Sequence, residues 1–219
     1  QGVKNFMPIT INGNGHISGL VVGGLPNGTV DADTLASNSV TTAKIHNAAV
    51  TSAKTSGIGG LTMADHWRIT NDGTLNTDST TQLNDSVSCN WERADTNSPG
   101  FIGTGMSEDN GVFTFPSTGI YQIIGNLQVG RNSAENRFAT LYCQVTTDNN
   151  TYTNAAGGSG GFGQDYQRNT CSLCYIFDVT NTSTHKVRFA CYTNRSSVVW
   201  RGDTTANYSA FVFMKLGDT

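Results

Sequence analysis

The chain has 219 residues, a formal net charge of −3 and only 13% charged residues, where about 25% is usual. This balance gives no electrostatic reason to bind nucleic acid or an anionic membrane, and no apolar run is long enough to cross a bilayer, so we expect no membrane insertion. The length suits one domain of about 150 residues together with an extension.

The N-terminal stretch, residues 1–28, alternates short apolar pairs with turn residues. In ITINGNGHISGLVVGGL, residues 9–25, Asn-Gly and Gly-Gly steps separate the apolar pairs, and this pattern predicts small strands joined by tight turns. Such a piece is too small to form a core of its own. We therefore expect residues 1–28 to be a docking segment, with residues 7–28 attaching the chain to a larger structure.

Residues 29–60 contain an internal repeat. Val30, Val40 and Val50 recur every ten residues, with Leu35 and Ile45 at the midpoints. A short fixed period is typical of a stacked architecture, and three parallel copies could share these few apolar side chains along an axis. A flexible Ala/Ser/Thr linker is the alternative interpretation. The repeat resembles those of fibre and virion structural proteins of tailed bacteriophages, marine ones in particular, and this resemblance implies a stalk.

The head, residues 61–219, has its clearest strand pattern between Gly111 and Val129. Phe113 and Phe115 alternate with smaller side chains, and Pro116 begins a turn. After the turn, one face of the next predicted strand carries only apolar side chains: Tyr121, Ile123, Leu127 and Val129. One core-facing side and one mixed side are typical of an antiparallel sandwich strand. Similar patterns along the head predict about ten strands and an all-β fold.

The same segment carries a resemblance to a known family. Its pattern Gly-x-Phe-x-Phe-Pro-x-x-Gly-x-Tyr, residues 111–121, resembles the signature of the complement component q globular head, whose jelly roll is shared with the tumour necrosis factors. The likeness covers residues 61–219 and includes the strand pattern ANYSAFVFMKL, residues 206–216. It implies a homotrimer of jelly-roll β-sandwiches that recognises a partner, and it implies neither an enzyme nor a cofactor.

The predicted strand at residues 206–216 is apolar on both faces. Tyr208, Ala210, Val212 and Met214 alternate with two phenylalanines, Phe211 and Phe213. A strand with two apolar faces must be covered twice, by its own sandwich on one side and by a neighbouring subunit on the other. We take Tyr208, Phe211 and Phe213 as candidates for the trimer interface.

The five cysteines all lie within apolar patterns: Cys89, Cys143, Cys171, Cys174 and Cys191. Their odd number and their surroundings predict buried, reduced thiols that behave as small hydrophobic side chains. Cys171 and Cys174 form a CxxC, but positions three apart in a strand point to opposite faces and cannot share a metal ion. Free thiols favour assembly in a reducing compartment, and no pattern of a secretory signal is present.

Two segments are candidates for ligand binding. Residues 156–170 form a predicted glycine-rich loop that carries Phe162, Tyr166 and Arg168, and a second predicted loop carries Trp200, Arg201 and Asp203. Aromatic and Arg side chains on exposed loops commonly bind sugars or proteins. The alternatives are that glycine only lets the first loop fold over the head, and that Arg201-Gly202-Asp203 is a chance tripeptide in a turn.

The sequence shows no arrangement of catalytic or metal-binding residues. The carboxylates and the four histidines are scattered, and no nucleophile motif is present, so we expect no enzyme, no catalytic residues, no metal and no cofactor. We interpret the chain as a homotrimeric virion protein of a tailed bacteriophage, assembled in the host cytoplasm. It would serve as a fibre or as a capsid or tail decoration protein. Its head would bind a glycan or protein of the host surface, and residues 7–28 would contact other virion proteins. A purely structural decoration protein and a cellular lectin-like head are the alternatives.

Overall fold

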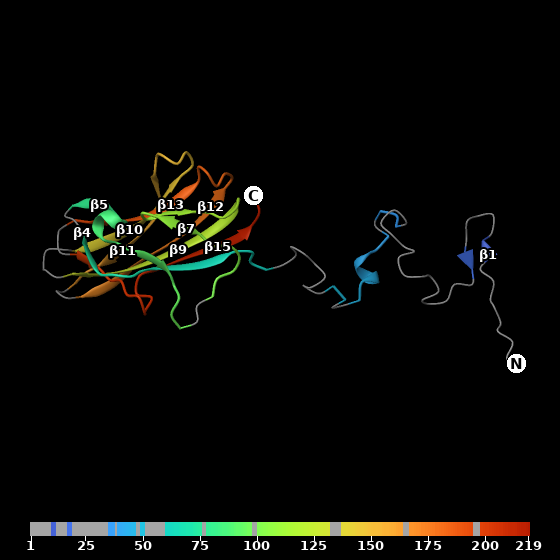
Figure 1. Ribbon diagram of the computed structural model, residues 1–219, viewed down its shortest axis with the longest axis horizontal. Coiled ribbons are helices and arrows are strands. Elements are labelled where there is room, and N and C mark those ends of the chain that lie inside the picture. Colours follow the sequence, from blue (N-terminus) through green and yellow to red (C-terminus); the bar gives the residue numbers. More distant parts are fainter. Residues whose placement is uncertain are drawn as a thin grey trace. The chain divides into compact units, whose positions relative to one another are not determined.

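The computed structural model describes residues 10–11, 17–18, 35–37, 39–46, 49–50, 60–75, 78–97, 100–131, 137–163, 167–194 and 198–219. The chain divides into two compact units, Gln1–Gly59 and Gly60–Thr219 (Figure 1). In the first unit, β1 (Thr10–Ile11) pairs antiparallel with β2 (Ile17–Ser18), and a short 3-10 turn, η1 (Thr42–Lys44), lies further along. Most of the predicted docking segment, residues 1–28, lies outside the described residues.

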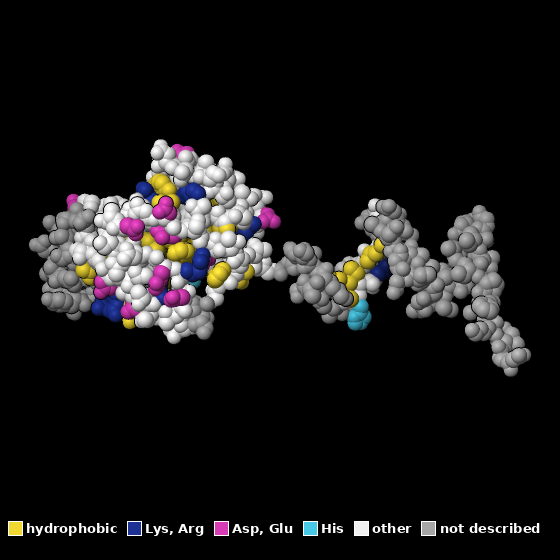
Figure 2. All heavy atoms as spheres, in the orientation of Figure 1, with side chains coloured by type: hydrophobic (Ala, Val, Ile, Leu, Met, Phe, Trp, Pro, Cys, Tyr) yellow, Lys and Arg dark blue, Asp and Glu magenta, His cyan; other side chains and the backbone are white. Residues whose placement is uncertain are grey.

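The repeat side chains that the structure describes are exposed. Leu35 and Ile45 are 46% and 39% accessible, and Val40 and Val50 are each 54% accessible. Figure 2 shows hydrophobic side chains open to solvent along this part of the chain. A single copy of the repeat therefore leaves its periodic apolar residues uncovered.

The second unit is a sandwich of two antiparallel sheets. Among the described residues, the first sheet has six strands, in the order β11-β10-β13-β8-β7 with β5 also paired to β13. Their bounds are β5 (Ser79–Gln82), β7 (Ser107–Asp109), β8 (Val112–Thr114), β10 (Phe138–Thr146), β11 (Thr153–Gly161) and β13 (Lys186–Thr193). A 3-10 turn, η3 (Asp85–Val87), follows β5.

The second sheet has seven strands in the described part of the chain, in the order β4-β14-β9-β15-β3-β6 with β12 on the other edge of β9. Their bounds are β3 (Ala64–Ile69), β4 (Gly73–Leu75), β6 (Trp91–Arg93), β9 (Gly119–Arg131), β12 (Arg168–Val179), β14 (Val198–Trp200) and β15 (Ala210–Gly217). The predicted all-β sandwich is therefore confirmed.

Strand β9 is the centre of the second sheet. It pairs with β12 from Gly119 to Gly130, and its opposite edge pairs first with β15 and then with β14. Its side chains alternate as predicted: Tyr121, Ile123, Leu127 and Val129 are all fully buried. Tyr121 keeps its hydroxyl satisfied by donating to the Ser117 carbonyl oxygen at 2.9 Å. A buried polar group with such a partner avoids the cost of desolvation.

Aromatic side chains from both sheets fill the centre of the sandwich. Phe113 and Phe189 of the first sheet meet Phe211 and Phe213 of the second, with ring centroids 5.0 Å apart for Phe113–Phe213 and 4.3 Å apart for Phe189–Phe211. Phe211 and Phe213 are both fully buried. The prediction that these two residues lie in a trimer interface is therefore wrong, because they point into the core of their own subunit.

A buried carboxylate, that of Asp65, is held by an ion pair with the partly exposed Arg93 and by further hydrogen bonds. Asp65 of β3 is 1% accessible and accepts hydrogen bonds from Arg93 Nε at 2.8 Å and from Trp67 Nε1 at 2.9 Å. The backbone N–H of Met106 donates to the same carboxylate at 2.7 Å. Burial alone would raise the pKa of Asp65, but these donors outweigh it and hold the pKa below its ordinary value.

The burial of the cysteines agrees with the prediction at four of the five positions. All five are free, and Cys89, Cys143, Cys171 and Cys191 are buried as predicted. Burial raises the pKa of Cys143 to about 12, so its thiolate is scarce at neutral pH. Cys174 is exposed, which corrects the expectation that all five are buried. It lies three positions after Cys171 in β12 and so points to the opposite face.

Candidate functional site

The glycine-rich segment predicted to be a loop is mostly a strand. Residues 153–161 form β11, which pairs along its length with β10. β12 crosses so close to it that a Cβ added to Gly158 would overlap the Ser172 carbonyl oxygen, and one added to Gly160 would lie 3.3 Å from Cys171 Sγ. Gly158 is needed because the backbone of β12 occupies the place of its side chain, and at Gly160 the side chains of Asn169 and Cys171 leave little room for one.

The structure places two of the three binding residues predicted for this segment, Phe162 and Arg168. Phe162 is only 7% accessible and belongs to the hydrophobic core, which corrects its assignment as an exposed binding residue. Tyr166 lies outside the described residues. Arg168 is exposed at the start of β12 and lines a shallow hollow of about 320 Å³ together with Asp72 and Thr74.

Trp200 is a core residue and not a surface anchor. It is fully buried in β14, where it pairs with Gly73 of β4, and its ring occupies the space where a side chain at Gly73 would stand. The indole Nε1 donates to the Asn71 carbonyl oxygen at 3.0 Å. Its predicted role in ligand binding is therefore wrong, because no face of the ring is open to a ligand.

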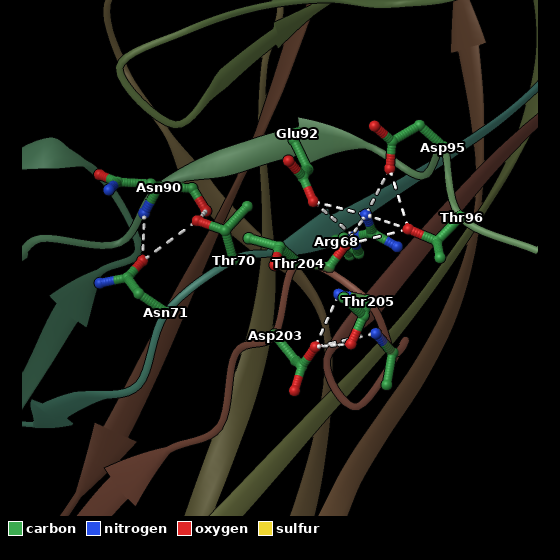
Figure 3. Close-up of polar contacts among 11 residues, drawn as sticks. Arg68, Thr70, Asn71, Asn90, Glu92, Asp95, Thr96, Asp203, Thr204 and Thr205 are labelled. Atoms are coloured by element: carbon green, nitrogen blue, oxygen red, sulfur yellow. Dashed lines mark hydrogen bonds and ion pairs between the residues drawn. The ribbon is translucent and has the colours of Figure 1, made fainter.

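Arg201 and Asp203 both make contacts within the chain, and Figure 3 shows the hydrogen bonds of Asp203. The Asp203 carboxylate accepts hydrogen bonds from the backbone N–H and the hydroxyl of Thr205, at 2.6 and 2.7 Å, and from the backbone N–H of Ala206 at 3.0 Å. The bonds from Thr205 and Ala206 lower the pKa of Asp203. The Arg201 guanidinium lies 3.9 Å from the ring centroid of Tyr208. These contacts give the two residues partners within the chain.

Arg68 of β3 holds the 201–205 segment in place through the Thr204 carbonyl oxygen. It is 1% accessible, forms ion pairs at 2.6 Å with Glu92 and with Asp95, and also donates to the Thr204 carbonyl oxygen (Figure 3). Thr96 donates to the same carbonyl oxygen at 3.1 Å. A buried guanidinium that holds two carboxylates and a carbonyl fixes the positions of β3, β6 and the 201–205 segment. This network is structural, and it explains why the Arg-Gly-Asp tripeptide is not a free loop tip.

The outer face of the second sheet carries apolar side chains that a single chain leaves partly uncovered. Ile124 of β9 lies between Val212 of β15 and Cys174 of β12 in register, and Met214 and Ile176 flank Gln122 one step along. Ile176 is 57% accessible, and Ile124, Val212 and Met214 are half-buried. We call Ile124, Cys174, Ile176, Val212 and Met214 the outer apolar face. The sequence placed Val212 and Met214 on the same side of the predicted strand as Tyr208, the one interface candidate that is exposed, at 37%. The other two candidates, Phe211 and Phe213, lie on the core side.

Among the residues that the structure describes, no group of three or more His, Cys, Asp or Glu side chains could hold a metal ion. No helix in the described part of the chain has the length and hydrophobicity to span a membrane.

Comparison with known proteins identifies the fold of the second unit. No protein-family model matches the sequence, and neither does any curated protein. Solved structures do match. Murine APRIL shares 11% identity over 70% of this chain and 98% of its own, with a TM-score of 0.51. Eiger TNF from S. frugiperda shares 12% identity over 73% of this chain and 96% of its own, also with a TM-score of 0.51. At this identity the likeness concerns the fold, and it confirms the predicted tumour necrosis factor-like jelly roll.

Proposed function

We propose that this chain is a homotrimeric virion structural protein of a tailed bacteriophage, a fibre or a capsid or tail decoration protein, whose jelly-roll head binds the host surface. The observation that carries the proposal is that both units leave apolar side chains uncovered in a single chain. In the head these form the outer apolar face, and in the first unit they recur along the repeat.

The outer apolar face supports association of the heads. Ile176, Val212 and Met214 come from β12 and β15, the strands that pair with opposite edges of β9. Ile124 of β9 lies between Val212 and Cys174, so apolar side chains extend across all three strands, beside the polar Gln122. Contiguous apolar surface on a soluble domain generally marks a contact with another protein. Three copies arranged around an axis would cover this surface in each subunit. The resemblance to the complement q and tumour necrosis factor jelly rolls implies the same arrangement.

The repeat supports a shared axis in the first unit. Leu35, Val40, Ile45 and Val50 supply one large apolar side chain per five residues, and all four are exposed. Too few of them exist in one chain to form a core, but three parallel chains would bring equivalent residues together at each level. This is the geometry of a stalk that carries a head, as the resemblance to phage fibre repeats implies.

The buried positions of Phe162 and Trp200 favour the second candidate, a decoration protein that stabilises the particle without binding a receptor. Two of the six residues chosen as receptor contacts serve the core instead. The two candidates share the trimer and the attachment to the particle, and they differ only in whether the head binds the host.

Labelling and adsorption test the proposal together. Antibodies raised against the full chain should bind tailed phage particles in electron micrographs, and the purified chain should compete with those particles for adsorption to host cells. Deletion of residues 7–28 should leave a folded head that no longer joins the particle. Labelling without competition would favour the decoration protein, and absence of the chain from every particle would overturn the proposal.

A further inference from the structure

The outward face of the first sheet carries a polar hollow of about 480 Å³ that the proposed trimer contacts do not use. Two cations, Lys186 and Arg188, lie two residues apart on β13, so both side chains point to this face while Val187 and Phe189 between and beside them point into the core. Pockets of this volume are in the range that binds small ligands.

Neither cation has a carboxylate partner among the described residues. Lys186 Nζ donates to Thr114 Oγ1 at 3.0 Å and to the Thr182 carbonyl oxygen at 2.8 Å. Arg188 donates through Nε to Gln144 Oε1 at 2.8 Å and through Nη1 to Gln82 Oε1 at 3.1 Å. All four acceptors are neutral. Partial burial lowers the pKa of Lys186 and that of Arg188, so each positive charge is held at a cost that an anion would offset.

The remaining lining suits a ligand with many hydroxyl groups. Tyr152 stands at the edge of the hollow with its ring 3.9 Å from the Arg188 guanidinium carbon, which fixes the guanidinium plane. The side-chain amides of Gln82 and three asparagines and the hydroxyl of Thr114 offer both donors and acceptors, whereas the Asp109 carboxylate on the exposed rim would repel an anion. A lining of amides and hydroxyls around two cations fits a sugar that carries a negative charge.

We infer that this hollow binds an acidic saccharide, with the carboxylate or sulfate of the sugar on Lys186 and Arg188. The planar guanidinium can pair with either anion through two parallel hydrogen bonds, and the lysine adds a second charge. The neutral amides and Thr114 then receive the sugar hydroxyls. This inference rests on the proposed function, since it names the class of host-surface molecule that the head would recognise.

Calorimetric titration of the full chain tests the inference with three probes: trigalacturonate, a sulfated galactose oligomer and neutral galactotriose. We expect one or both acidic probes to bind, with affinity that falls as salt is added, and galactotriose to bind at least about tenfold more weakly because it lacks the charge-assisted bonds. Binding of only the carboxylated or only the sulfated probe would identify the anion. Equal binding of all three, or binding of none, would overturn the inference.

Substitutions of Lys186 and Arg188 test whether the acidic probe binds in this hollow. Lys186→Gln should weaken the acidic probe about tenfold by removing one charged hydrogen bond, and Lys186→Gln with Arg188→Gln should abolish it. Because Arg188 also links β13 to β5 and β10, the double variant is checked by its thermal melting. Asp109→Asn removes a repelling charge from an exposed rim residue and should tighten the acidic probe about twofold to fivefold without changing the fold. Arg137→Gln, which removes an exposed cation outside the hollow, is the matched control and should leave affinity unchanged.

The result is separable from the fate of the proposed function. If antibodies detect the chain on particles and the chain blocks adsorption, but it binds neither acidic probe, only the saccharide site is refuted. A chain that binds an acidic probe through Lys186 but is absent from particles would leave the site standing and overturn the virion assignment.

Discussion

Val212 and Phe213 are neighbours on β15, but we expect a substitution of Val212 to affect trimer assembly and one of Phe213 to affect the stability of the fold. Val212 is half-buried on the outer apolar face, whereas Phe213 is fully buried in the core. Val212→Asp should therefore leave the head folded and break the trimer. In sedimentation, the wild-type protein should have three times the chain mass of 23.3 kDa, and the variant should have the mass of a single chain.

The size of this effect follows from exposure. Full burial of a valine is worth about 1.5–3 kcal/mol, so covering the smaller part of Val212 that is still exposed contributes less than about 1 kcal/mol per subunit. An aspartate in its place loses that gain and adds an unpaired carboxylate, which costs several kcal/mol in an apolar contact. Summed over three subunits, association should weaken by about 6 kcal/mol or more, which is over four decades in the association constant.

Sedimentation velocity at micromolar concentration measures the outcome, with thermal melting as the check on folding. Thr80→Asp is the matched control, because it places the same charge on an exposed residue of β5 in the other sheet. It should sediment as the wild type. A Val212→Asp chain that keeps the trimer mass, or a wild-type chain that is monomeric, would refute the assignment of the outer apolar face as the interface.

Four further outcomes are expected. Phe213→Ala should cost the head about 3–5 kcal/mol of unfolding free energy in urea titrations, since it empties a fully buried ring site. Gly158→Ala should cost about 1–3 kcal/mol or more because its Cβ overlaps the backbone of β12, whereas Gly161→Ala, with its nearest atom at 3.6 Å, should cost less; equal melting points would contradict the close approach. A thiol reagent should label Cys174 rapidly, and the other four only after unfolding, because burial raises their pKa values. The pKa of Asp65 is depressed in the folded head, so its stabilisation is present above the ordinary value of 3.8 and is lost as pH falls through the folded value; Asp65→Asn should flatten this acid dependence and cost about 3–5 kcal/mol at pH 7. An acid titration of stability that is the same for both proteins would contradict this.

The strands that sequence predicted best are those with large side chains on one face. Tyr121, Ile123 and Leu127 share a face without polar side chains, whereas the other face carries Gln122 and Asn126 beside Ile124, so the period of two in β9 is visible without a structure. The same signal was ambiguous in β15, because both of its faces are apolar. Which face of β15 enters the core depends on the residues of the first sheet that it meets. Phe113 and Phe189 of that sheet pack against Phe213 and Phe211, so the phenylalanine face is the buried one.

The glycine-rich strand could not be predicted from local pattern. Glycine weakens strands, so four glycines between residues 157 and 161 favour a loop on propensity alone. The reason for them is the approach of β12, a strand that follows β11 in sequence but belongs to the other sheet. Trp200 posed a similar difficulty, because the space for its ring is created by Gly73, far away in the sequence.

Part of the polar hollow could have been predicted from the sequence. Lys186 and Arg188 alternate with the core residues Val187 and Phe189, so their shared outward face is readable from the sequence. The other lining residues, among them Gln82 and Tyr152, come from separate parts of the chain, and only the pairing of β13 with β5 and β10 brings them together.

The place of β15 between β9 and β3 sets the order in which a newly made chain can mature. β3 has no pairing partner on that edge until β15 is synthesised, and β9 lacks the same neighbour. Until then a nascent chain on the ribosome has two open strand edges, which are the places where chains mispair. Val212 and Met214 arrive with the same strand, so the surface proposed for assembly is completed in the step that closes the sheet. Association through the complete outer apolar face therefore has to wait for β15, while the open edges of β3 and β9 stay exposed to mispairing until then.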